Sequence, residues 1–520
     1  MNMSDCPALL WDCVERNAER CGDRVAIVHQ YGRCTFGELR DMACTLARAL
    51  VRLGIGPGDT VSYQLPNWIE TLAVVLATLR IGAVANPIVP IYRRRELAFI
   101  VRDAATRVLF VPGVYRGFDH LALAREIELP AGVPVVACGP GTGGEHGFEG
   151  LLALGAPAGA PIDYARDPQA DAFCIYTSGT TGNPKGVRHC QRGLMIEAQS
   201  YADYSGVDAR SVSLIVSPIT HITGITHAHF LPQLTAMKAC MLDQWSPQLA
   251  IETIEREGCT LMGGATPFLQ MLVDTLRAHP GRVPTLKLFR CGGAGVPPQL
   301  VRDAQALGIE TVRCYGSTEH PTISGAAGGD PELAATTDGR VHDHVGIRIV
   351  DPADEQRVLA LGEPGEIQSR GPELFLGYRD PSQDAEAFTA DGWFRTGDIG
   401  VLDARRHVTI VGRKKDIIIR KGENISARDV EDALSAHPAL AQVAVFGLPD
   451  RERGEMVAAA VVLRPGQQFD LARMAQFLDG IGLARRKFPE RLEILDALPM
   501  TASGKIRKVD LQRRFAPASQ

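Results

Sequence analysis

Residues 176–186 read YTSGTTGNPKG and contain the residue types that bind a polyphosphate. Glycines let successive backbone N–H groups converge on phosphate oxygens, because they adopt conformations that are closed to residues with a Cβ. The hydroxyl groups add donors, and the lysine adds a charge suited to the β- and γ-phosphates. The candidate phosphate ligands are Thr177, Ser178, Gly179, Thr180, Thr181, Gly182, Lys185 and Gly186. The sequence predicts an ATP-binding loop after the buried strand DAFCIY.

This loop differs from a Walker A loop. That motif requires Gly, four residues and then Gly-Lys-Ser/Thr, whereas Pro184 stands where the second glycine would be. A surface turn rich in glycine and threonine is the structural alternative. The whole stretch is instead similar to the signature of the adenylate-forming superfamily, which contains acyl-CoA synthetases, firefly luciferases and the adenylation domains of peptide synthetases.

Other motifs of this superfamily follow along the chain in the family's order. They are YGSTE (315–319), GWFRTGD (392–398), GRKKDIIIRKGENIS (412–426) and PMTASGK (499–505), with weaker matches in TFGEL (35–39), CGGAGVP (291–297) and GEPGEIQSRGPELFLGY (362–378). The resemblance therefore covers essentially the whole chain. The joint match is specific, although a motif such as GWFRTGD would not be specific alone.

The resemblance implies a set of nucleotide contacts. Tyr315 would lie against the adenine ring, and Asp398 would accept hydrogen bonds from both ribose hydroxyls, as a carboxylate does well. Arg413 would donate to the same sugar. The backbone of Gly293, Ala294 and Gly295 would follow the purine edge, and Gly316 and Thr318 would also contact the nucleotide. For Asp398 alone, the structural alternative is a turn carboxylate.

The resemblance also implies the groups that neutralise charge. Glu319 and Thr180 or Thr181 would hold Mg²⁺, which prefers few carboxylates together with substrate oxygens. Lys505 would be the catalytic cation beside the acid and the α-phosphate. Without the other motifs, Lys505 would be interpreted as an exposed lysine of a basic tail and Glu319 as a helix cap.

The acid and thiol sites are expected on two further segments. His221, in SPITHITG, matches the family position that lines the approach of the carboxylate. Lys421 and Gly422 would approach the coenzyme A thiol after a rotation of the small C-terminal domain near Lys415. That rotation is implied only by the resemblance. Two departures from the family pattern are Gly295, often proline, and Lys415, often aspartate.

The reaction implied is an AMP-forming, two-step ligation of a carboxylic acid to coenzyme A that uses ATP and Mg²⁺. Peptide-synthetase domains place an aspartate near the position of His221 to pair with an amino group, and SPITHITG offers none. An amino-acid substrate is therefore not expected. The segments NPIVPIYRRREL, SPITHITG and YGSTEH together resemble ligases of alicyclic acids such as cyclohexanecarboxylate and short- to medium-chain acyl-CoA synthetases, and this resemblance implies such an acid. A luciferase-like oxygenase and an enzyme that loads a carrier protein are the two alternatives.

Composition excludes several other classes. The formal net charge of −5 argues against a general nucleic-acid binder, and the 12 cysteines form no CxxC pair typical of zinc sites. The N-terminus lacks the pattern of a secretory signal, and no apolar run reaches the length of a membrane span. A cytoplasmic protein is expected, with small-molecule partners only and a homodimer left open.

Short apolar runs alternate with amphipathic helical patterns over residues 25–137, which favours an α/β architecture with mostly parallel strands. The predicted fold is a multidomain α/β and α+β protein. A large AMP-binding domain, residues 1–411, would contain α/β subdomains and a smaller β-rich part, and a small mobile α+β domain would comprise residues 412–520. Residues 324–339 are interpreted as a weakly structured stretch.

Three patterns support weaker alternatives. GPGTGG (139–144) satisfies the dinucleotide fingerprint, but the region after it is too short and too rich in glycine and proline for a βαβ unit. His221, His227 and His229 suggest a metal, yet no Cys, Asp or Glu stands beside them, so packing is preferred for the latter two. The run Arg93 to Arg95 is interpreted as a solvated helix start.

Overall fold

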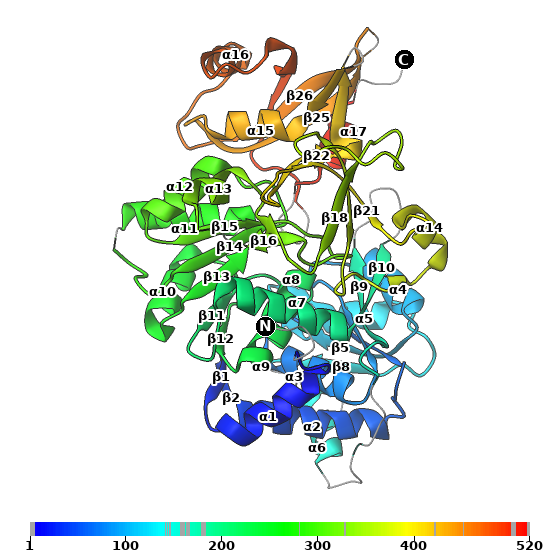
Figure 1. Cartoon of the computed structure of the whole chain (residues 1–520). Coiled ribbons are helices and arrows are strands. Elements are labelled where there is room, and N and C mark those ends of the chain that lie inside the picture. Colours follow the sequence, from blue (N-terminus) through cyan, green and yellow to red (C-terminus); the bar gives the residue numbers. More distant parts are fainter. Residues whose placement is uncertain are drawn as a thin grey trace.

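The computed structural model describes residues 6–140, 142, 144, 147–156, 162, 167–177, 184–279, 281–326, 329–420, 423–450, 452–500 and 506–516. Figure 1 shows a large body formed by the chain up to β22, here called the N-terminal body. A smaller part, drawn in orange and red, stands on it and is formed by the described residues from Ile417 onward. This part is called the C-terminal unit.

Two seven-stranded sheets form the centre of the N-terminal body among the described residues. The first has the strand order β15 (Glu310–Cys314), β14 (Leu288–Gly292), β13 (Leu261–Gly264), β11 (Val212–Ile215), β12 (Lys238–Met241), β1 (Val25–His29), β2 (Gly32–Thr35). The second has the order β20 (Gly377–Tyr378), β10 (Lys185–Cys190), β9 (Asp171–Thr177), β4 (Val84–Pro87), β3 (Thr60–Tyr63), β5 (Thr106–Pro112), β8 (Val135–Cys138).

Most neighbouring strands in both sheets are parallel, as the alternation of apolar runs and helices predicts. The exceptions are the pairs β1–β2, β9–β10 and β10–β20, which are antiparallel. A short hairpin of β6 (Val114–Tyr115) and β7 (Phe118–Asp119) lies apart from both sheets. Parallel strands need crossover helices, and these cover the sheets.

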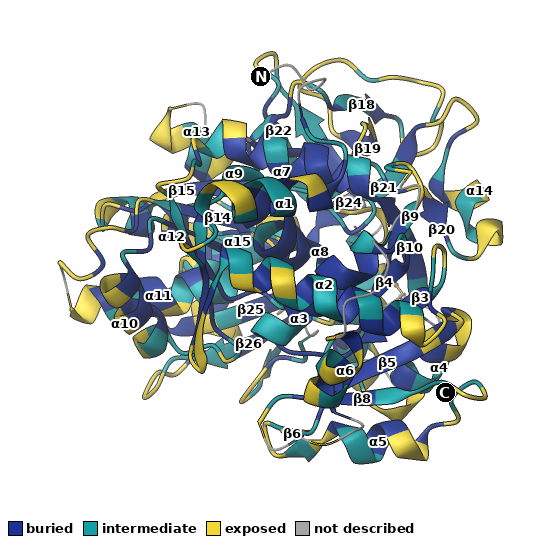
Figure 2. Ribbon diagram, turned by 90° about the horizontal axis from the view of Figure 1, so that it is seen from below, coloured by how far each residue is buried: buried dark blue, intermediate teal, exposed yellow. Residues whose placement is uncertain are grey.

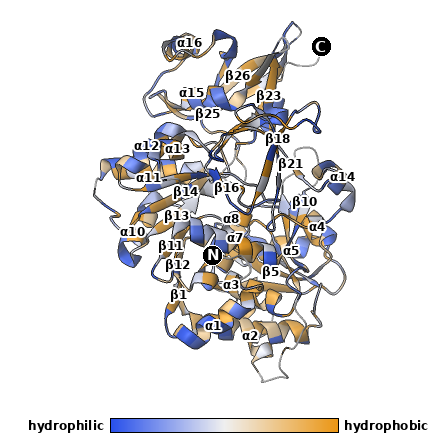
Figure 3. Ribbon diagram, viewed as in Figure 1, coloured by the Kyte–Doolittle hydropathy of each residue, from blue (hydrophilic) through white to orange (hydrophobic). Residues whose placement is uncertain are grey.

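One hydrophobic core joins the two sheets. It includes Ile27 and Met241 of the first sheet and Val61 and Phe173 of the second. Helix α3 (Ile69–Arg80) is buried over residues 71–79, which is typical of a helix enclosed on all sides. Figure 2 shows the inner strands in the dark blue of buried residues, and Figure 3 shows hydrophilic residues on outer helices such as α10.

The helices of the N-terminal body alternate with these strands. They are α1 (Leu10–Cys21), α2 (Phe36–Arg52), α3, α4 (Arg94–Asp103), α5 (His120–Glu126), α6 (Phe148–Gly155), α7 (Gln191–Ser205), α8 (Ile222–Ile225), the π-helical turn η2 (Thr226–Phe230), α9 (Leu231–Thr235), α10 (Pro247–Glu257), α11 (Thr266–Ala278), α12 (Pro298–Ala306) and α13 (Pro331–Thr336). The apolar positions of α10 to α12 pack on one face of the first sheet. Helix α7 and η2 lie in contact with each other and with the rest of the core.

A β-rich part connects this body to the C-terminal unit. Its antiparallel sheet has the order β18 (Gly346–Val350), β19 (Gly365–Arg370), β21 (Phe394–Leu402), β22 (Val408–Arg413), and α14 (Asp384–Ala387) lies beside it. The two-stranded sheet of β16 (Ser324–Ala326) and β17 (Arg340–Val341) precedes it. The proposed domain boundary between residues 411 and 412 lies within β22.

The C-terminal unit combines one mixed sheet with flanking helices. Its strands are β24 (Glu423–Ser426), β23 (Ile417–Arg420), β26 (Gly454–Leu463) and β25 (Leu440–Asp450), with β27 (Arg491–Ile494) paired to β26. Its helices are α15 (Ala427–Ser435), α16 (Leu471–Gly480) and α17 (Lys508–Phe515). Together with the N-terminal body, it confirms the predicted α/β and α+β fold class.

One expectation needs correction. Residues 324–339 contain β16 and α13, so most of this stretch has regular structure. The topology agrees with the rejection of the dinucleotide fingerprint, because β8 and the next strand along the chain, β9, are separated by β4, β3 and β5. No helix among the described residues combines the length and the hydropathy that a membrane span requires.

Candidate active site

A cavity of about 1600 Å³ lies between the N-terminal body and the C-terminal unit. Several of its walls are the segments that follow parallel strands of the first sheet, including residues 218–221 after β11 and 293–295 after β14. In open α/β sheets, ligands bind at the carboxyl ends of the strands. The position of the cavity therefore follows from the topology.

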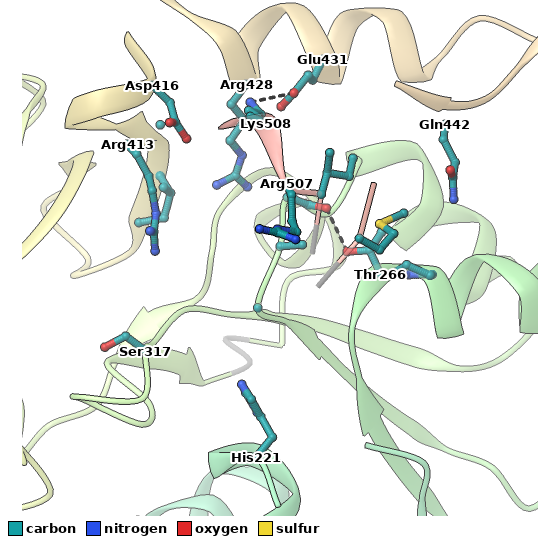
Figure 4. Close-up of a pocket in the computed structure, with 18 of the residues that line it drawn as sticks. His221, Thr266, Ser317, Arg413, Asp416, Arg428, Glu431, Gln442, Arg507 and Lys508 are labelled. Carbon is teal, nitrogen blue, oxygen red and sulfur yellow. Dashed lines mark hydrogen bonds and ion pairs between the residues drawn. The ribbon is translucent and has the colours of Figure 1, made fainter. Parts of the chain in front are cut away.

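The cavity brings together every predicted site residue that the structure describes except Gly186. These are Thr177, Lys185, His221, Gly293, Ala294, Gly295, Tyr315, Gly316, Thr318, Glu319, Asp398 and Arg413. Figure 4 shows His221 pointing into this space from one side and Arg413 and Arg507 from the other. The remaining predicted residues, namely Ser178, Gly179, Thr180, Thr181, Gly182, Lys421, Gly422 and Lys505, lie outside the described residues.

Asp398 is held by two side chains that the sequence also assigns to the nucleotide site. Its Oδ2 accepts a hydrogen bond from the Tyr315 hydroxyl at 2.8 Å, and its Oδ1 lies 3.2 Å from Arg413 Nε. Asp398 and Arg413 face each other in the register of β21 and β22. The charge of Asp398 is the largest cause of the raised pKa of Arg413. This arrangement fixes a carboxylate at the cavity wall.

The loop after β14 forms the opposite wall. Gly293 has a φ of +82°, a conformation that favours glycine. The carbonyl oxygen of Gly295 accepts a hydrogen bond from Thr266 Oγ1 at 2.9 Å. A Cβ at Gly295 would lie 3.7 Å from Arg428 Nε, an ordinary contact. The structure thus gives no steric reason for glycine at residue 295.

The predicted phosphate loop connects two antiparallel strands, because Thr177 of β9 is paired with Lys185 of β10. Lys185 Nζ lies 4.9 Å from the ring centre of Tyr378, which places the ammonium over an aromatic face. Gly186 does not have the positive φ that its place in the loop suggests. Crowding favours glycine there, since a Cβ would lie 3.0 Å from Cys174 Sγ and its neighbours would have to shift.

Glu319 presents a carboxylate to the same cavity. Its Oε1 accepts a hydrogen bond from the Tyr378 hydroxyl at 2.9 Å. A single oriented carboxylate beside a phosphate site suits Mg²⁺, which keeps several waters and takes substrate oxygens as its other ligands. The donor chemistry of Glu319 therefore fits the expected ion, although the threonines proposed to share it lie outside the described residues.

The loop that carries Glu319 is anchored from behind by buried histidines. His189 Nε2 lies 2.7 Å from the Thr318 carbonyl oxygen. Glu373 Oε1 lies 3.6 Å from His320 Nε2 and 2.7 Å from His344 Nε2. Burial alone would raise the pKa of Glu373, but the two histidines outweigh it and lower this pKa to about 2. Glu373 is therefore an ionised anchor for the loop.

Tyr378 was not singled out as a site residue from the sequence, yet it contacts both Lys185 and Glu319. We expect Tyr378→Phe to lower the apparent affinity for Mg²⁺-ATP by about 3- to 10-fold, the scale of one lost hydrogen bond. The ring under Lys185 would remain. Initial rates at varied Mg²⁺ and ATP would measure this effect. Tyr204→Phe, outside the cavity, is the control, and an unchanged KM for Mg²⁺-ATP in Tyr378→Phe would exclude the positioning role.

Arg428 of the C-terminal unit is a second cavity residue that sequence reasoning missed. Its Nη2 donates to Asp338 Oδ1 at 3.0 Å, and Arg313 Nη2 donates to the same oxygen at 2.8 Å. Burial would raise the pKa of Asp338, but Arg428 and Arg313 lower it. Arg428 stands in α15, outside every motif quoted above, so no sequence signal marked it.

The C-terminal unit carries two segments that the sequence assigns to catalysis, one with Lys505 and one with Lys421. Their described flanking residues differ in whether they line the cavity. Met500 and Ile506, which flank residues 501–505, are paired in a β-bridge and both line the cavity. Arg420, which precedes residues 421 and 422, forms an ion pair with Glu490 at 2.6 Å and is not among the cavity residues. The flanks of the Lys505 segment are thus at the cavity, and the described flank of the Lys421 segment is not.

The other residues noted in the sequence occupy mixed positions. His229 is buried and His227 is partly buried, and burial lowers the pKa of each to about 3, so both are neutral. Arg93 precedes α4 as its N-cap residue. All three arginines are exposed, so the run is a solvated helix start as expected, and Arg93 and Arg95 also line the cavity.

Comparisons with known proteins place the whole chain in one enzyme family. Residues 14–379 match the family model of AMP-binding enzymes, and residues 429–505 match that of the AMP-binding enzyme C-terminal domain. The chain is 33% identical to the medium-chain fatty-acid–CoA ligase of Escherichia coli, over 98% of this chain and 91% of the relative.

A second relative is the salicyl-AMP ligase / salicyl-S-ArCP synthetase of Mycobacterium tuberculosis, 32% identical over 96% of this chain and 90% of the relative. Among solved structures, ATP-bound MatB from Rhodopseudomonas palustris superposes with a TM-score of 0.87 at 29% identity. That match covers 97% of this chain and 98% of the other.

Proposed function

Because the chain belongs to the AMP-binding enzyme family, we propose that it activates a carboxylic acid as an acyl-adenylate and transfers the acyl group to the thiol of coenzyme A. The observation that carries this proposal is the single cavity lined by the residues expected to bind adenine, ribose, phosphate and acid. Those residues come from segments as far apart in the chain as Thr177 and Arg413. Their convergence supports a common substrate.

In the first step, a carboxylate oxygen of the acid attacks the α-phosphorus of ATP and pyrophosphate leaves. Two anions must meet, so the protein contributes mainly positioning and neutralisation of charge. Asp398 and Arg413 would hold the ribose, Lys185 would bind the outer phosphates, and Glu319 would hold Mg²⁺. The ion supplies screening of the phosphate charge. Lys505 would stabilise the charge that develops near the α-phosphate.

In the second step, the thiolate sulfur of coenzyme A attacks the acyl carbonyl carbon and AMP leaves. We propose that the C-terminal unit rotates between the steps with its pivot near Lys415, so that Lys421 and Gly422 replace Lys505 at the cavity. Before this rotation, the Lys505 segment should lie at the cavity and the Lys421 segment away from it. The positions of Met500 and Ile506 at the cavity and of Arg420 away from it support this orientation.

The acid is expected to lack an α-amino group, since no carboxylate accompanies His221 in SPITHITG to pair with an ammonium. Acid-dependent exchange of pyrophosphate into ATP should therefore be much faster with alicyclic, aromatic or medium-chain acids than with any proteinogenic amino acid. A panel of such acids with ATP and Mg²⁺ would measure this. Faster exchange with an amino acid would exclude the assigned substrate class.

A carrier protein is a second candidate for the group that accepts the acyl chain. One observation favours it, namely that one relative is named a salicyl-AMP ligase / salicyl-S-ArCP synthetase. Incubation with ATP, Mg²⁺, the acid found by exchange and coenzyme A, followed by mass spectrometry, distinguishes the two acceptors. Formation of acyl-CoA at a rate comparable to exchange supports the ligase. Rapid exchange without acyl-CoA would instead indicate that the acyl group is passed to a carrier protein.

A further inference from the structure

Arg290 is a buried cation in the wall behind the candidate active site. It lies in β14, between Gly263 of β13 and Val312 of β15, and is only 5% exposed. Its guanidinium group lies 4.5 Å from the ring centre of Tyr201, and its Nη1 donates to Ser205 Oγ at 2.8 Å. Both contacts are to α7, so this helix covers the guanidinium.

Arg290 has no ion-pair partner within 4.0 Å in the described part of the chain, and its Nη2 has no hydrogen-bond partner there. Burial would lower the pKa of Arg290, but Cys314, Tyr201 and Glu197 outweigh it, so the charge is only partly compensated. A buried charge is costly unless it is paired, and an arginine cannot lose its proton to reduce that cost. Its free donor therefore calls for an acceptor from outside the chain.

Other polar atoms around Arg290 also lack partners in the described structure. They are the hydroxyl of Tyr201, Oε2 of Glu197 and Nε2 of His342. Burial raises the pKa of Glu197 to about 7, so near neutral pH this residue carries only part of a negative charge. Buried polar groups nearly always have partners. Several unpartnered atoms in one place indicate that a polar ligand or ordered water completes the cluster.

This cluster adjoins the cavity. Cys314 lines the cavity, and a Cβ at Gly325 would lie 2.9 Å from Cys314 Sγ and 2.5 Å from Arg290 Nη2. His227, whose pKa is lowered by burial and then by Arg290, stands in η2, which continues the helix that begins after His221. Arg290 is therefore one side chain behind the cavity wall and is linked to the segment that carries His221.

We propose that the acid-binding part of the cavity extends behind Cys314 to Arg290, and that the substrate acid carries a second oxygen acceptor at the end remote from its reacting carboxyl group. This acceptor, a carboxylate or a carbonyl oxygen, would bind Arg290 Nη2 and the Tyr201 hydroxyl. The inference rests on the proposed function and specifies its acid. It differs from the sequence expectation of an acid such as unsubstituted cyclohexanecarboxylate.

Matched pairs of acids test this proposal directly. The pairs are cyclohexanecarboxylate with 4-oxocyclohexanecarboxylate, benzoate with 4-carboxybenzoate, and hexanoate with adipate. Pyrophosphate exchange gives kcat/KM for each acid. For the carbon skeleton that the enzyme accepts best, the acid with the second oxygen acceptor should have a kcat/KM about 10- to 100-fold higher than the acid without it. This is the ratio expected for one hydrogen bond to a charged group.

Variants then assign the preference to Arg290. Arg290→Met removes the charge but keeps a long unbranched side chain, and the ratio within the pair should fall to about one or below. Tyr201→Phe should reduce the ratio partly, and it serves as the second variant if Arg290→Met does not fold. Arg210→Met, which removes an exposed arginine paired with Asp208 just beyond α7, is the control and should leave the ratio unchanged.

The outcomes separate the two proposals. Exchange without preference for the second acceptor, or a preference that survives both Arg290→Met and Tyr201→Phe, would overturn the role of Arg290 and leave the ligase function intact; ordered water would then complete the cluster. Absence of exchange with every acid of the panel would reject the proposed function and this inference together.

Discussion

Lys505→Ala should slow formation of the acyl-adenylate by about 10²- to 10³-fold or more, the scale for losing one preorganised group that stabilises developing charge. Transfer of the acyl group from supplied acyl-AMP to coenzyme A should remain largely intact, because the proposed rotation has moved Lys505 away by then. Pyrophosphate exchange measures the first half-reaction, and acyl-CoA formation from synthetic acyl-AMP measures the second.

Gly422→Leu provides the reciprocal variant. A bulky side chain on this segment should block the approach of the thiol and spare adenylate formation. Lys487→Ala, which removes a lysine of the C-terminal unit that pairs with Asp429 and lies outside the cavity residues, should leave both half-reactions unchanged. If Lys505→Ala and Gly422→Leu each impaired both half-reactions equally, with folding and ATP binding intact, the two-orientation mechanism would be wrong.

Asp398→Ala should weaken binding of both ATP and AMP by about 10- to 100-fold. The ribose would lose a charged acceptor whose hydrogen bonds contribute about 1.5–3 kcal/mol each before water compensates. The variant would also leave Arg413 without its ion-pair partner and the Tyr315 hydroxyl without its acceptor. The defect should appear in nucleotide affinity more than in the rate at saturation.

Calorimetric titration with AMP and the KM for ATP would measure this loss. Asp391→Ala is a matched control, since Asp391 also pairs with an arginine, Arg348, but lies outside the cavity residues. Circular dichroism and thermal unfolding would establish that both variants fold. Unchanged affinity for ATP and AMP in folded Asp398→Ala would remove Asp398 from the nucleotide site.

The fold class and the described part of the candidate site could be predicted because their signals are local. Glycine, hydroxyl and charged residues in short motifs stand where strands end, and the parallel topology brings strand ends to one edge. Gly293 and Tyr315 follow neighbouring parallel strands of the first sheet, which explains why they line the same side of the cavity, whereas Thr177 ends a strand of the second sheet.

The remaining features depend on contacts between residues far apart in the chain. Tyr378 reaches Glu319, 59 residues away, only because β20 is paired with β10 at the edge of the second sheet. In the sequence, Arg290 is an ordinary residue before CGGAGVP. It is buried because α7 packs over it, and this packing cannot be deduced from the residues next to Arg290 in the chain. Such pairings are decided by tertiary packing.

The shared oxygen of Asp338 has a consequence for the proposed rotation. If α15 turns away, Arg428 returns to water, yet Asp338 keeps its hydrogen bonds from Arg313 and from the Ile410 amide. Breaking a buried ion pair is costly when it leaves an unpaired charge in the interior. Asp338 is not left unpaired in this way. The charge of Asp338 therefore stays paired within the N-terminal body whether or not the C-terminal unit is docked. For this reason, the docked and rotated forms can lie close in free energy.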